Sequence, residues 1–113
     1  MTGPARLRER PVLAEQLSVL CAEGRRSGSG FVLGALAALR WLTEGDPGPL
    51  TGCLDRPIPL RAVVHELAAA EAVIYGRPSA QRQYAQGVEH ALMWAQFATS
   101  CPPAALWTVR PGT

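Results

Sequence analysis

GFVLGALAALRWLTE, residues 30–44, contains the longest strongly apolar run of the chain. Its apolar residues recur every three or four positions, the spacing that places side chains on one face of an α-helix. Only two of its residues, Arg40 and Glu44, are charged. We therefore predict that this stretch forms the most buried helix of the protein. Its apolar face would consist of Val32, Ala35, Leu36, Leu39 and Leu42, widened by Phe31 and Ala38.

Three further segments show helical spacing, with glycine or proline at each junction. The predicted helices are residues 11–23, ended by Gly24; residues 59–75, ended by Gly76; and residues 79–100, begun at Ser79 and ended by Pro102-Pro103. The apolar stripes would be Leu13, Leu17 and Leu20, with Cys21 at the margin, in the first of these; Leu60, Val63, Val64, Leu67 and Ile74 in the second; and Tyr84, Val88, Ala91, Leu92 and Ala95 in the third.

These segments together predict an all-α fold, a small four-helix bundle. The bundle would form one domain over residues 11–113, after a charged N-terminal arm of residues 1–10. Residues 46–58, rich in proline and glycine, are expected to form an irregular loop between the second and third helices. A fifth short helix is allowed within residues 103–109. No stretch alternates apolar and polar residues, so no sheet is expected.

The composition says more about the source organism and the cellular compartment of the protein than about its function. All 11 basic residues are arginine, and lysine and asparagine, which have AT-rich codons, are absent. This favours a high-GC bacterial source, such as an actinobacterium or one of its mobile elements. Cys21, Cys53 and Cys101 are scattered, as free thiols in a reducing cytosol are. Residues 1–11 lack the apolar segment of a signal peptide, so we expect a cytoplasmic protein that does not enter a membrane.

The sequence shows no recognised catalytic or metal-binding pattern. His65-Glu66 does not continue as H-E-x-x-H, because Ala69 stands at the second histidine position. Glu89-His90 lacks the E-x-x-H spacing of di-iron bundles. We expect both histidines on the surface, and a non-enzymatic protein without catalytic residue, metal or cofactor. A cysteine–histidine pair assembled from distant segments is the alternative left open.

Glu71 is the most unusual residue of the third predicted helix, because it falls in the middle of the apolar stripe. A buried carboxylate has to be paired, hydrogen-bonded or protonated. We predict that Glu71 is a buried polar residue that pairs with Arg40 or Arg82, or accepts a hydrogen bond from Trp41 or Tyr84. A carboxylate that contacts a ligand inside the bundle is the alternative.

The last predicted helix carries Met93, Trp94 and Phe97 outside its apolar stripe. Large apolar side chains off the core face need a cover, and methionine and aromatic residues are enriched at protein interfaces. We predict that these three residues bind a protein partner or a second subunit. The C-terminal tail with Trp107 is the alternative cover.

The segment before residue 30 suggests an anion site. Arg25, Arg26, Ser27 and Ser29 belong to a predicted Gly/Ser linker that opens onto a helix N-terminus, where free N–H groups and the helix dipole attract anions. The competing interpretation is a flexible connection, because the segment lacks the G-K-[ST] ending of a phosphate loop.

Taken as a whole, the residues favour a helical protein-interaction or regulatory module that acts as a homodimer or an accessory subunit. The alternative is a nucleic-acid-binding regulator whose arginines contact phosphates. A net charge of +2 is too small to imply nucleic-acid binding by itself. The arginines that would serve this alternative are Arg6, Arg8, Arg10, Arg25 and Arg26.

Overall fold

The computed structural model describes residues 6–108, and of residues 25–27 and 106–108 it describes the backbone alone. This part of the chain is all-α, as predicted, with four main helices, a short fifth helix and no strand. The helices are α1 (Arg10–Ser27), α2 (Gly30–Glu44), α3 (Leu60–Ile74), α4 (Arg82–Ala95) and α5 (Pro103–Thr108). None of them is long and apolar enough to cross a membrane.

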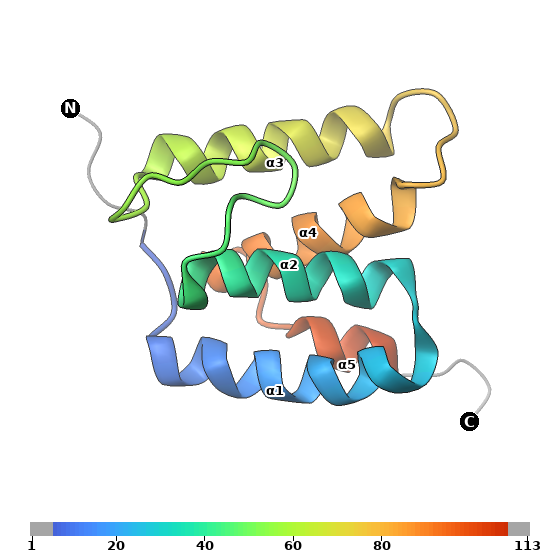
Figure 1. Cartoon of the computed structure of the whole chain (residues 1–113), viewed down its shortest axis with the longest axis horizontal. Helices are drawn as coiled ribbons and strands as arrows, with labels where there is room; N and C mark the ends of the chain where they lie inside the picture. Colours follow the sequence, from blue (N-terminus) through green and yellow to red (C-terminus); the bar gives the residue numbers. More distant parts are fainter. Residues whose placement is uncertain (1–5, 109–113) are drawn as a thin grey trace.

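The central helix is α2, as its apolar spacing predicts. It packs against α1 on one side and α4 on the other, and α3 lies beyond α4 at the edge of the molecule (Figure 1). The left-handed conformation of Gly45, with φ 82°, ends α2 at the predicted position. The buried residues of α2 are Val32, Gly34, Ala35, Leu36, Ala38, Leu39, Trp41 and Thr43.

Two glycines allow α2 and α4 to cross in backbone contact. A methyl group on Gly34 would lie 1.9 Å from the carbonyl oxygen of Tyr84. A methyl group on Gly87 would lie 2.0 Å from the carbonyl oxygen of Phe31. Neither distance is compatible with a side chain, so these glycines set how closely the two central helices approach.

The end of α1 differs from the prediction. The helix continues through Gly24 to Ser27 and ends at Gly28, whose φ of 62° is left-handed and whose N–H donates to the carbonyl oxygen of Gly24 at 3.1 Å. A methyl group on Gly24 would lie 3.2 Å from Leu36 Cδ1, so this glycine lets α1 pack closely on α2 instead of ending the helix. The connection to α2 is therefore only residues 28–29.

The end of α4 also differs from the prediction. The helix ends at Ala95 rather than near Ser100, and Phe97 adopts a left-handed φ of 66°. The N–H groups of Gln96 and Phe97 donate to the carbonyl oxygens of Leu92 and Trp94. The turn that follows brings the chain back to α5, which contacts α1, α2 and α4.

Candidate functional site

Residues 6–108 contain no group of three or more His, Cys, Asp or Glu side chains that could hold a metal ion. His65 is exposed on α3, as predicted. His90 is half-buried and donates from Nε2 to the carbonyl oxygen of Cys101 at 2.8 Å, so the prediction of a surface position is wrong for this residue. The contact ties α4 to the segment that leads into α5.

The buried carboxylate of α3 is Glu66, and the prediction that it is Glu71 is wrong. Glu71 is exposed, whereas Glu66 is fully buried. The inner face of α3 is formed by Ala62, Val63, Glu66, Ala70 and Ile74. Of the predicted stripe, Val63 and Ile74 are buried, whereas Leu60 and Val64 are exposed. Trp41 Nε1, one of the partners expected for Glu71, is buried without a hydrogen-bond partner in the described part of the chain.

Glu66 holds the loop between α2 and α3 against the bundle. Its Oε1 accepts hydrogen bonds from the backbone N–H groups of Leu50 and Thr51, the latter at 3.2 Å. Its Oε2 accepts one from the Thr51 hydroxyl at 2.5 Å. A methyl group on Gly48 would lie 2.7 Å from Oε2, so glycine is needed where the loop passes. Burial and, to a smaller extent, the negative charge of Glu66 raise the pKa of the Tyr84 phenol.

The surface predicted from Met93, Trp94 and Phe97 is largely covered from within the chain. Trp94 is buried, Met93 is half-buried, and only Phe97 is well exposed, at 53%. Arg8 lies over this surface, with its guanidinium carbon 4.9 Å from the Trp94 ring centroid and 4.5 Å from that of Phe97. The predicted position of Trp94 off the core face is therefore wrong, and a partner contact through Met93, Trp94 and Phe97 stays a prediction. The side chain of Trp107 lies outside the described residues.

Arg8 also satisfies the C-terminal end of α4. Its Nε donates to the carbonyl oxygen of Trp94 at 2.7 Å, and its backbone N–H donates to that of Ala95 at 2.8 Å. A second guanidinium nitrogen donates to the carbonyl oxygen of Thr99 at 3.1 Å. A cation at a helix C-terminus interacts favourably with the helix dipole. Arg8 thus ties the described part of the N-terminal arm to α4. Sequence patterns could not reveal this contact, because the two residues that form it lie 86 positions apart.

The predicted anion site is not a linker. Arg25, Arg26 and Ser27 form the last turn of α1, and their side chains lie outside the described part of the structure. Ser29 is the residue before α2. The premise of a flexible Gly/Ser loop is therefore wrong, and anion binding stays a prediction.

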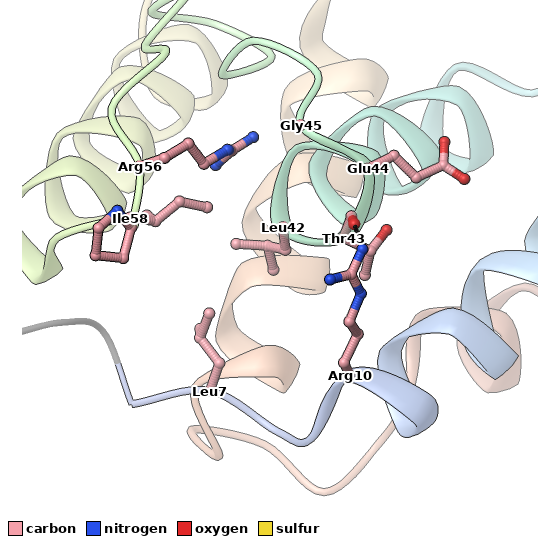
Figure 2. A pocket seen from close by; sticks show the side chains of 9 residues that line it. Leu7, Arg10, Leu42, Thr43, Glu44, Gly45, Arg56 and Ile58 are labelled. Carbon is pink, nitrogen blue, oxygen red and sulfur yellow. Dashed lines mark hydrogen bonds between the residues drawn. The ribbon is translucent and has the colours of Figure 1, made fainter.

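A hollow of about 520 Å³ opens at the C-terminal end of α2 (Figure 2). Leu7, Leu42 and Ile58 provide apolar lining, and the Arg10 and Arg56 guanidinium groups provide positive charge. Sequence reasoning missed this hollow, because its residues come from three separate segments.

Both guanidinium groups of the hollow are engaged by α2 itself. Arg10 donates to the carbonyl oxygen of Thr43 at 2.5 Å, and Arg56 donates to that of Trp41 at 2.7 Å. The carboxylate of Glu44 points away from the hollow in Figure 2. The main chemistry here is capping of a helix C-terminus, which leaves only the remaining N–H groups for an anion.

A second apolar surface lies on the exposed side of α3. Leu60 and Val64 are 42% and 51% exposed, and Tyr75, directly after the helix, is 77% exposed. Spacings of three and four residues place them on one stripe with Ala68 and Glu71. We call this surface the outer face of α3. All of its residues are exposed: Leu60, Arg61, Val64, His65, Ala68, Glu71, Ala72 and Tyr75.

Comparisons with protein-family models, with curated proteins and with solved structures find no match for this chain.

Proposed function

We propose that this chain is a non-enzymatic protein-interaction module that binds its partner through the outer face of α3. The observation that carries the proposal is that α3 is apolar on two opposite sides. Its inner side is filled by α4 and the loop held by Glu66, while Leu60, Val64 and Tyr75 remain exposed on the other. Exposed large apolar side chains grouped on one face and bordered by polar residues are typical of a protein-interaction site.

The other candidate surfaces support this choice less well. Arg8 covers most of the surface around Trp94, and the arginines of the hollow are engaged by α2. Nucleic-acid binding gains no support, because Arg8 and Arg10 donate to backbone carbonyl oxygens of this chain. We place the module in the cytoplasm, since its three cysteines are free thiols, as is usual in a reducing compartment.

Site-specific photo-crosslinking tests the proposal. Val64 is replaced by photoreactive benzoylphenylalanine, and the labelled chain is irradiated in an extract of its source organism. The matched control carries the same group in place of Val19, a valine of α1 that is 43% exposed. We expect a protein adduct from position 64 that is absent from position 19 and is lost when Leu60→Glu is added. Equal adducts from both positions, or none from position 64, would overturn the proposal.

A further inference from the structure

The charges on the outer face of α3 are arranged against the dipole of that helix. Arg61 lies in the first turn, where the dipole is positive, and Glu71 lies in the last turn, where it is negative. Within the chain Arg61 is 3.6 Å from Asp55, but both side chains are more than half exposed. Such surface ion pairs contribute little to stability, so the charge pattern of α3 is not explained by the single chain.

Glu71 in particular is left facing another acid. The described part of the chain shows no ion pair for it. Its negative charge acts on Glu89 of α4. The pKa of Glu89 is raised first by burial and then by the charge of Glu71, while His90 lowers it. A cation supplied from outside the chain would relieve this repulsion.

The two halves of the outer face complement each other. The first half carries the larger aliphatic side chains Leu60 and Val64 together with Arg61 and His65. The second half carries the small Ala68 and Ala72 together with Glu71 and the aromatic Tyr75. Basic residues of one half thus have an acid in the opposite half if the face meets its own copy in the reverse direction.

We infer that the outer face of α3 binds the same face of a second copy of this chain, with the two α3 helices antiparallel about a two-fold axis near Ala68. This inference rests on the proposed function and names its partner. A symmetric dimer of this kind uses one self-complementary patch twice. Residues at equal distances from the helix middle then lie at the same level, so Leu60 faces Tyr75 and Val64 faces Glu71.

The same register brings opposite charges together. Arg61 of one copy lies three residues, about 4.5 Å along the axis, from the level of Glu71 of the other. A long arginine side chain can span that offset. Arg61 also lies level with the C-terminal end of α3 of the other copy, where the Tyr75 ring can receive a guanidinium. Parallel pairing would instead set Glu71 against Glu71 and Arg61 against Arg61. The charges therefore select the antiparallel orientation.

Sedimentation of the full chain tests the inference, over concentrations from about 1 µM to about 1 mM. The wild type should change from the mass of one chain to that of two. Val64→Glu should abolish association, and the matched control Val19→Glu should not. All these positions are exposed, so the helical circular dichroism of each variant should stay unchanged.

Charge exchange tests the orientation. Arg61→Glu and Glu71→Arg should each weaken association by about tenfold, the equivalent of 1.4 kcal/mol, because each sets like charges together. The double variant should regain wild-type association, because it restores an opposite pair at each end. A double variant no tighter than the single ones would overturn the antiparallel pairing.

The outcomes separate this inference from the proposed function. A wild type that keeps the mass of one chain at every concentration overturns the second copy as partner. If position 64 then crosslinks to a different protein, the interaction module stands with another partner. If it crosslinks to nothing, both proposals fall.

Discussion

Replacement of Glu66 by alanine should release the loop between α2 and α3 from the bundle. The carboxylate is fully buried and accepts hydrogen bonds from Leu50 N–H, Thr51 N–H and the Thr51 hydroxyl. Residues 45–59, which contain these donors, form no helix or strand of their own. The effect should therefore be both a loss of global stability and a local opening of this loop.

The three donors of the loop give the magnitude. A hydrogen bond to a charged group contributes about 1.5–3 kcal/mol to stability. Leu50 is half-buried, whereas Thr51 is exposed and its two donors can return to water. The hydrogen bond from Leu50 should contribute in full and the two from Thr51 in part. Together they give an expected loss of about 3 kcal/mol in the free energy of unfolding for Glu66→Ala. Glu66→Gln keeps the acceptor for both backbone N–H groups, so its loss should be about 1 kcal/mol.

Urea denaturation measures these losses, and hydrogen exchange of the Leu50 and Thr51 amides measures the local opening. The control is Glu71→Ala, which removes an exposed carboxylate from the same helix and should change stability by no more than about 0.5 kcal/mol. A Glu66→Ala variant as stable as wild type, or a Glu71→Ala variant as unstable as Glu66→Ala, would refute this assignment of the buried acid.

A second readout reports the charge of Glu66. Since its negative charge contributes to the raised pKa of Tyr84, Glu66→Gln should shift the ultraviolet titration of that phenol toward its ordinary range. The shift should be partial, because burial is the larger cause. Glu71→Gln should leave the Tyr84 titration where it is, and an equal shift in both variants would contradict the assignment.

Three further changes test other parts of the fold. Gly34→Ala should lower the free energy of unfolding by about 3 kcal/mol or more in urea denaturation, because its methyl group would meet a carbonyl oxygen of α4 at 1.9 Å; wild-type stability would contradict the close crossing. Arg8→Ala should lower the free energy of unfolding by about 1–2 kcal/mol. It should also shift tryptophan fluorescence to longer wavelength, because Trp94 loses the guanidinium that covers it. The pKa of Glu89 is raised in the folded chain. The stability that Glu89 contributes is therefore fully present at a pH below the ordinary pKa of glutamate, and it is lost as the pH rises through the raised pKa. Glu89→Gln should therefore raise the free energy of unfolding at neutral pH and leave it unchanged in acid, which denaturation across a pH series would measure.

The sequence by itself determined which segments are helical and which helix is central. Apolar residues at helical spacing and the glycines and prolines between them act over a few neighbouring residues, so α2 and α3 begin and end within a residue of their predicted limits. The charge-poor run of residues 30–44 could only be a buried helix in a chain of this size.

Tertiary structure alone decided which side of each helix is covered and by what. In α3 large apolar residues occur on both sides, so the spacing of apolar residues could not show that Glu66 faces inward and Glu71 outward. The N–H groups that stabilise the buried Glu66 carboxylate come from the loop between α2 and α3, 15 and 16 residues away in the sequence. Arg8 covers Trp94 for the same reason, since a cation over an indole at a helix end is a contact between opposite ends of the chain. Gly24 and Gly28 look alike as helix stops, and only the packing of α2 against Gly24 sets them apart.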